Sequence, residues 1–129
     1  MGELIERIPL DNGLNLELYN HSRPVAGDRW LVSLEARIEI EVKPEYFTRP
    51  IEDVSFEVVK AILGEKVTYR YEKRRNFIAE TEKEAILNGL KARFLDTTFG
   101  YLSSPGFPRR FIQRKYQEAT SKLLKWRKI

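Results

Sequence analysis

The sequence predicts an α+β fold in which helices cover one face of an antiparallel sheet of about four strands. Apolar residues recur at every second position from Trp30 to Val42, and all but Leu31 of the residues between them are polar, which is typical of a long strand with one buried face. The last third of the chain carries apolar residues at helical spacing. A length of 129 residues fits one domain, residues 1–129. The expected element order is β-β-β-α-β-α-α, ending in a helical hairpin.

The first two strands are expected at residues 4–10 and 14–21, around Asp11-Asn12-Gly13. An Asn-Gly pair supplies the positive φ angles that a tight hairpin needs. Residues 21–28, HSRPVAGD, are expected to form a loop because Pro24 and Gly27 interrupt the pattern.

The long strand at 30–42 carries glutamates on its polar side, and pairing with Arg37 and with Arg70 of a later strand explains them. An irregular connection follows at 43–53. Residues 54–63 fit a short helix capped by Asp53 and ended by Gly64, or a strand, and we favour the helix. Residues 65–78 are expected to form the next strand.

Two helices are expected to complete the chain. Thr81 and Glu84 form a capping-box pattern before a helix that runs to about Phe99 or Leu102. The stretch SSPGFPRRF at 103–111 interrupts the pattern, and a last helix is expected over 108–127. Arg109 and Arg110 then oppose the helix dipole, so we expect one or both to pair with carboxylates of the first half of the chain. The alternative is that they bind an external anion or an acidic partner.

Several kinds of chemistry lack sequence support. The chain has no cysteine and one histidine, which excludes disulfides, thiolate metal sites and histidine clusters. His21, Ser22 and Asp28 share a loop, but no G-x-S-x-G elbow is present, and a polar turn is the simpler interpretation. No nucleotide-binding glycine motif occurs, so no cofactor is expected. These observations favour a non-enzymatic protein, with a cytoplasmic location and no membrane partner as further expectations.

Charge is divided unevenly along the chain. Residues 1–64 hold 7 basic and 12 acidic residues, a net charge of −5, whereas residues 65–129 hold 16 and 7, a net charge of +9. Such a basic half suits an anion or an acidic partner. The candidate binding residues are Lys73, Arg74, Arg75, Arg109, Arg110, Arg114, Lys122 and Lys125.

The leading functional hypothesis is therefore an interaction module that binds an acidic protein, or a second copy, through its basic C-terminal half. An alternative is binding of single-stranded nucleic acid or RNA by Lys73–Arg75 and the last helix, because residues 69–77 interleave aromatic and basic side chains. A second alternative is a ligand-binding or catalytic pocket at the seam of sheet and helix, lined by Trp30, Tyr69 and Tyr71.

Overall fold

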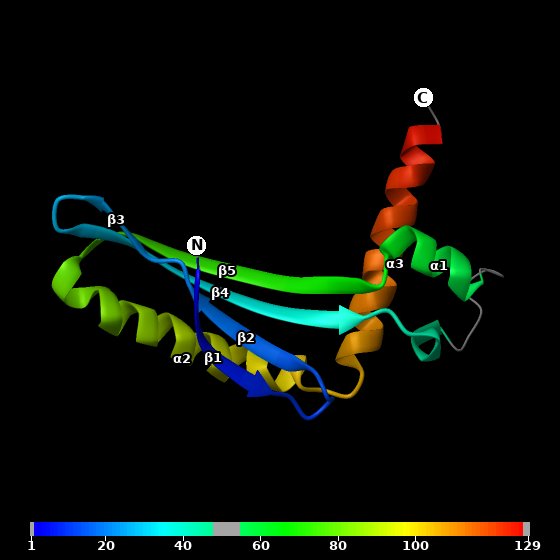
Figure 1. The fold of residues 1–129 in the computed structure, drawn as a ribbon, viewed down its shortest axis with the longest axis horizontal. Helices are drawn as coiled ribbons and strands as arrows, with labels where there is room; N and C mark the ends of the chain where they lie inside the picture. The colour runs from blue at the N-terminus through cyan, green and yellow to red at the C-terminus, as the bar shows by residue number, and fades with distance from the viewer. Residues whose placement is uncertain (1, 48–54, 128–129) are drawn as a thin grey trace. The chain divides into compact units, whose positions relative to one another are not determined.

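The computed structural model describes residues 2–47 and 55–127, which form an antiparallel five-stranded sheet and three α-helices (Figure 1). The strands are β1 (Glu3–Pro9), β2 (Asn15–Asn20), β3 (Arg23–Ala26), β4 (Arg29–Glu41) and β5 (Lys66–Ala79). The α-helices are α1 (Phe56–Leu63), α2 (Lys83–Leu102) and α3 (Phe107–Arg127), and two short 3-10 helices are η1 (Pro44–Phe47) and η2 (Glu80–Glu82). The predicted fold class is confirmed, with the last two helices joined by residues 103–106.

β4 is the central strand of the sheet. β2 pairs with it from Glu17↔Arg37 to Asn20↔Leu34, and β3 continues in the same register with Arg23↔Leu31. β2 and β3 therefore follow one edge of β4 in succession, and β5 pairs with its other edge.

The prediction of a loop over residues 21–28 is wrong in part, because Arg23–Ala26 forms β3. The proline in this segment lies on a strand that pairs on one side, where a missing N–H group is tolerated. Gly27 remains at the turn into β4, with a φ of 55°.

The Asp11-Asn12-Gly13 hairpin forms with a wider loop than predicted. Leu10 N donates to Leu14 O at 2.8 Å, which leaves three loop residues, and Gly13 has the positive φ of 88°. Asn12 instead donates from Nδ2 to Leu102 O at 2.7 Å and to Ser104 O at 2.9 Å. Its side chain thus satisfies carbonyls at the C-terminal end of α2.

The chain divides into two compact units, and β4 and β5 pass through both. The first unit comprises residues 1–38 and 69–104, and the second comprises 39–68 and 105–129. The expectation of a single domain stays a prediction.

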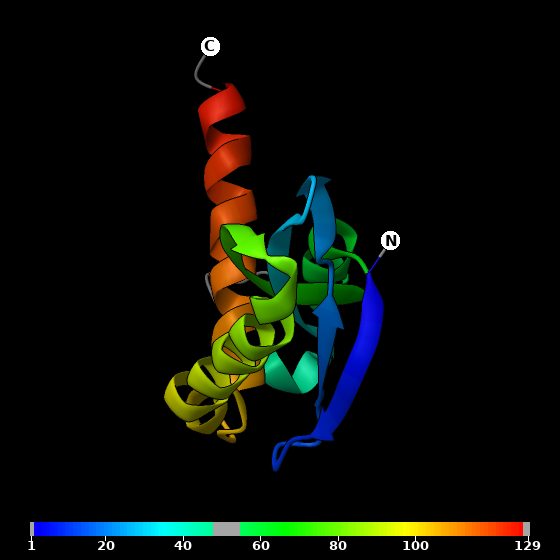
Figure 2. The same cartoon turned by 90° about the vertical axis from the view of Figure 1, so that its left-hand side faces the viewer.

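In the first unit, α2 covers one face of the sheet (Figures 1 and 2). From Val32 to Ile38 the alternating residues of β4 on that face are fully buried, as the sequence predicts, whereas Trp30 is half-buried. Leu90 and Phe94 of α2 are buried too. The buried apolar side chains of β2 and β4 here are Leu16, Leu18, Val32, Leu34, Ala36 and Ile38.

The second unit packs α3 with α1 and η1. Phe47 contacts Tyr116 edge-on at 6.1 Å between ring centres, and Phe107 is fully buried. The helix alternative for 54–63 is confirmed: α1 ends at Gly64, whose φ is 83° and whose N–H donates to Lys60 O. Its N-cap is Ser55, and the predicted cap Asp53 lies outside the described residues.

The predicted capping box of Thr81 and Glu84 is wrong. Residues 80–82 form η2, and α2 begins at Lys83 without a side-chain cap. The backbone N–H of Glu80 donates to Asp28 O at 2.8 Å, so pairing with the end of the sheet determines where the chain turns into the helix.

Candidate functional site

The sheet face opposite α2 is polar, and its centre is the buried carboxylate of Glu35. This side chain is 6% exposed, although its strand position predicts solvent. Oε1 accepts from His21 Nε2 at 2.7 Å and from Arg37 at 2.8 Å, and Oε2 lies 2.8 Å from Arg70 Nε. The backbone of Gly2 lies against the His21 ring, where a Cβ atom would collide. The predicted pairing with Arg37 and Arg70 is confirmed.

This cluster does not provide a free catalytic group. Both oxygens of Glu35 already have partners, because Oε1 accepts from His21 and Arg37 and Oε2 lies against Arg70. Ser22 Oγ accepts from Ser33 N at 3.0 Å, and the Asp28 carboxylate lies 3.8 Å from Arg29. His21, Ser22 and Asp28 therefore each have separate partners.

Two further groups on this polar face have shifted pKa values. The hydrogen bond from Arg74 lowers the pKa of Glu72, and a second hydrogen bond from Ser33 contributes. Burial raises the pKa of Tyr19, and the nearby carboxylate of Glu17 adds to the shift. Among residues 2–47 and 55–127, no group of three or more acidic or histidine side chains is arranged to hold a metal ion.

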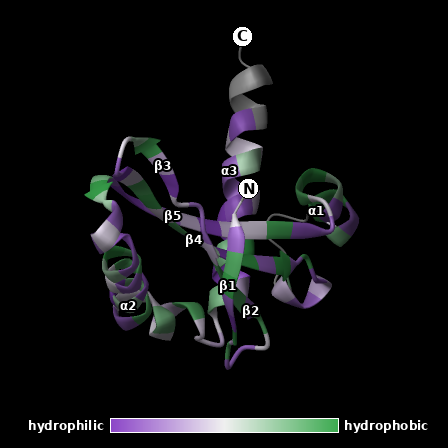
Figure 3. Cartoon of the chain, turned by 60° about the vertical axis from the view of Figure 1, so that its left-hand side comes forward, coloured by the Kyte–Doolittle hydropathy of each residue, from purple (hydrophilic) through white to green (hydrophobic). Residues whose placement is uncertain are grey.

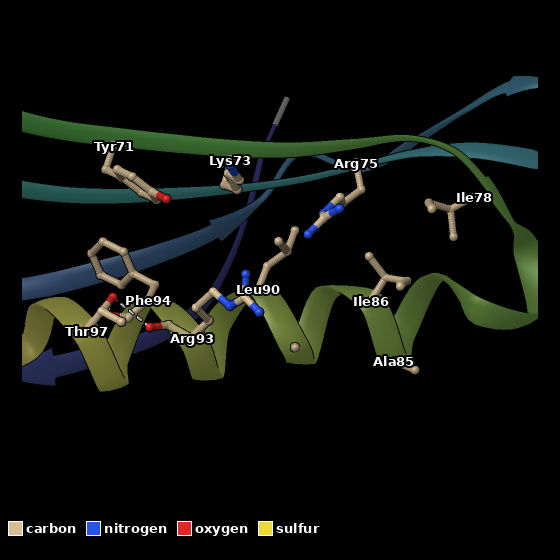
Figure 4. Close-up of a pocket in the computed structure, with 11 residues that line it drawn as sticks. Tyr71, Lys73, Arg75, Ile78, Ala85, Ile86, Leu90, Arg93, Phe94 and Thr97 are labelled. Carbon is tan, nitrogen blue, oxygen red and sulfur yellow. Dashed lines mark hydrogen bonds between the residues drawn. The ribbon is translucent and has the colours of Figure 1, made fainter.

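On the opposite face of the sheet, the side chains of β5 and α2 enclose a groove of about 460 Å³ (Figure 4). At one end, the rings of Tyr71 and Phe94 lie 4.9 Å apart between centres. Ile78 and Ile86 line the other end, and Leu90 lies between the two ends of the groove. A volume of this size falls within the range of small-molecule sites.

Three cations line the groove: Lys73 and Arg75 from β5, and Arg93 from α2. Arg75 and Arg93 point into the space between strand and helix (Figure 4). No acidic residue lines it, and within the described ranges none of the three cations is within ion-pair distance of a carboxylate. We call these three side chains and the walls around them the cationic groove.

Gly89 opens the α2 wall of the cationic groove. It is exposed in the middle of a helix, and a Cβ atom placed on it would meet no atom within 4 Å. A side chain at this position would project into open space. Glycine lowers helix stability at this position, and because it has no side chain it leaves the groove wide.

Arg74, the remaining candidate on β5, is not brought together with these cations. Arg74 faces the polar side of the sheet, where its Nε lies 2.6 Å from Glu72. Lys73, Arg74 and Arg75 thus alternate between two faces, because side chains of a strand alternate. The candidates on α3 belong to the second unit.

The two arginines at the start of α3 lie in different surroundings. Arg109 donates to the backbone carbonyl of Glu45 at 3.1 Å, so a carbonyl takes the place of the predicted carboxylate. The guanidinium of Arg110 folds back over Gly106. Arg114 lies 5.9 Å from the ring centre of Phe111 and Lys122 is exposed, while the side chain of Lys125 lies outside the described part.

The predicted seam pocket has a different lining from the one expected. Tyr71 lines the cationic groove, whereas Tyr69 does not, and Trp30 is covered by Lys83 Nζ at 3.7 Å from its ring centre. Sequence reasoning missed Gly89 and Arg93. A glycine beside the apolar stripe of a helix is a signal that could have found this wall.

Comparisons with known proteins add no relative. No family model, no curated protein and no solved structure matches this chain. No helix among residues 2–47 and 55–127 is long and apolar enough to cross a membrane.

Proposed function

We propose that this protein is a non-enzymatic interaction module that binds a small anionic ligand in the cationic groove. The observation that carries the proposal is the convergence of Lys73, Arg75 and Arg93 without an acidic residue in the lining. Cations held together without counter-charges favour an anion, because the ligand relieves their mutual repulsion. All three belong to the basic half of the chain, in a protein for which we propose a cytoplasmic location.

The walls of the groove define the rest of the ligand. Ile78, Ile86 and Leu90 offer an aliphatic surface, and Tyr71 with Phe94 offers an aromatic one. Burial of apolar area contributes affinity, and the few charged groups orient the ligand. The ligand class that fits is an amphipathic anion: an apolar body that carries a carboxylate, sulfonate or phosphate.

This proposal is tested with a matched pair of fluorescent probes. Anilinonaphthalene sulfonate carries a negative charge, and N-phenylnaphthylamine has the same apolar body without it. We expect saturable binding of the sulfonate, weakened about tenfold by Arg93→Gln and by Arg75→Gln, which corresponds to about 1.4 kcal/mol. Binding of the neutral probe should change less in the same variants.

Two controls make the result specific to the groove. Lys60→Gln removes an exposed cation of α1 and should leave both probes unaffected. Gly89→Leu places a side chain in the open space of the groove and should weaken both. Sulfonate binding that is equal in wild type, Arg93→Gln and Gly89→Leu would contradict the proposal.

A further inference from the structure

Phe77, near the end of β5, has a backbone conformation that phenylalanine rarely adopts. Its φ is 59°, and no other non-glycine residue in the described part of the chain has a positive φ. In this region Cβ crowds the neighbouring carbonyl oxygen, so a bulky residue destabilises the fold. Strained residues of this kind gather at functional sites.

The positive φ has a definite effect on the side chains around it. Before it, Lys73 and Arg75 line the cationic groove, and Arg74 and Asn76 line a recess on the other side of β5. Phe77 joins Arg74 and Asn76 in that recess, and Ile78 returns to the groove. The alternation is thus shifted by one residue at Phe77. The strain places an aromatic ring in the recess, where it is 63% exposed.

The recess is basic and apolar together. It is lined by Arg23, Val25, Ala26, Leu31, Arg74, Asn76 and Phe77, which we call the Phe77 patch. The lining includes no acidic residue, and Val25 is 41% exposed. Figure 3 shows hydrophobic colour at one end of β3. The guanidinium of Arg29 lies 5.5 Å from the centre of the Phe77 ring.

The cations around the ring differ in how far they are neutralised. Arg74 pairs with Glu72 at 2.6 Å, and Arg29 lies 3.8 Å from Asp28. No ion pair involves Arg23 within residues 2–47 and 55–127. Oδ1 of Asn76 accepts from Phe77 N at 3.0 Å, which orients the amide and leaves its NH₂ group as a donor for a ligand.

We propose that the Phe77 patch binds single-stranded nucleic acid. A base stacks on the exposed ring of Phe77, and the adjoining phosphates meet Arg23 and Arg74. An exposed ring among cations suits this ligand because every base has a flat π-face and every nucleotide a negative charge. A purely apolar partner would leave the guanidinium groups desolvated without counter-charges.

The test measures fluorescence anisotropy of labelled oligothymidylate and oligouridylate, each of twelve nucleotides, at 50 and 200 mM KCl. We expect salt-sensitive binding, because phosphate contacts release counterions. Phe77→Gly should weaken binding about tenfold without lowering the melting temperature, because glycine adopts a positive φ freely. Phe77→Asn also tolerates this φ and lacks the ring, so it should behave in the same way. Phe77→Tyr should retain affinity.

Two further variants distinguish the loss of a phosphate contact in the Phe77 patch from the loss of a positive charge anywhere on the protein. Arg23→Gln should weaken binding and reduce the slope of log K against log salt by about 0.7. Lys60→Gln is the control for loss of an exposed cation elsewhere. The proposal is overturned if neither oligonucleotide binds, if Phe77→Gly binds as wild type does, or if polyglutamate competes as well as the oligonucleotides. These side chains differ from those of the cationic groove, so either proposal can fail alone.

Discussion

Glu35 shows how one residue stabilises the polar face of a sheet. Its carboxylate is nearly inaccessible, yet it is surrounded by donors from three strands or strand ends: His21, Arg37 and Arg70. Charge-assisted hydrogen bonds of this kind are shorter and stronger than neutral ones. The cost of burying the carboxylate is therefore offset by its partners. An amide in its place has no charge and one acceptor oxygen instead of two, so at least one of these donors loses its acceptor.

We expect Glu35→Gln to lower the free energy of unfolding by about 2 kcal/mol. This loss of free energy of unfolding is smaller than the full cost of breaking a buried ion pair, because Arg70 is 61% exposed and can regain contact with water. Glu39→Gln is the matched control on the same strand, since Glu39 is 60% exposed and 3.7 Å from Lys66. It should cost less than about 0.5 kcal/mol. Urea unfolding measures both, and equal effects would show that Glu35 has no special role.

The sequence could predict the partners of Glu35 but not its burial. Alternation in β4 places Glu35 and Arg37 on the polar face, and the antiparallel order brings Arg70 across from Glu35. Burial additionally needs His21, which reaches Glu35 because β2 and β3 keep one register along β4. That register continues through a segment whose proline predicted a loop. Phe77 gave no signal either, because a positive φ is favoured by glycine and asparagine rather than phenylalanine.

Helix α2 combines a structural and a functional face. Leu90 and Phe94 are buried against the sheet, and Gly89 and Arg93 are exposed along the edge of the cationic groove. A helix designed for stability would carry a longer side chain in place of glycine. The ligand proposed for the cationic groove would occupy the space that glycine leaves open here.

Gly89→Ala should raise the free energy of unfolding by about 0.5–1 kcal/mol. Alanine loses less backbone entropy in a helix, and no atom lies within 4 Å of the new Cβ. Gly64→Ala is the contrasting variant: it also has open space around its Cβ but a φ of 83°. It should destabilise by about 1 kcal/mol, because alanine resists that conformation. Thermal unfolding of both variants checks this prediction. Destabilisation by Gly89→Ala would contradict the view that Gly89 has an ordinary helical backbone with open space around its Cβ position.

Elements with a long periodic pattern could be predicted well, and their ends could not. β4 and the two long helices lie within one or two residues of the expected positions. The capping box predicted for α2 does not form, because a hydrogen bond from Glu80 N to Asp28 O, far away in sequence, sets where the chain turns into the helix. The cationic groove needs β5 and α2 side by side, which no local pattern specifies.

Across the whole molecule, part of the uneven charge is balanced by pairs between the acidic and basic halves of the sequence. Glu35 pairs with Arg70, Glu39 with Lys66, and Glu6 with Lys91. Among the residues that the structure describes, the three cations of the groove take part in no such ion pair. A chain selected for stability alone would place a carboxylate near them.

At Arg93, a substitution should change the stability of the protein and its affinity for the ligand in opposite directions. Arg93→Glu places a carboxylate in the groove that Lys73 and Arg75 line, so it should be more stable than Arg93→Gln by about 0.3–1 kcal/mol in low salt. Glutamate and glutamine have the same shape, so the comparison isolates the charge. The difference should vanish in 1 M NaCl, where the Debye length is about 3 Å.

The same charge should act in the opposite sense on the ligand. Arg93→Glu should bind anilinonaphthalene sulfonate more weakly than Arg93→Gln does, because the new carboxylate repels the sulfonate and occupies its cations. Urea unfolding at two salt concentrations and a fluorescence titration measure the two effects on the same samples. A glutamate variant that is less stable than the glutamine variant in low salt would mean that an acidic group already neutralises the groove. Gain of stability with loss of binding would locate the ligand's negative charge between β5 and α2.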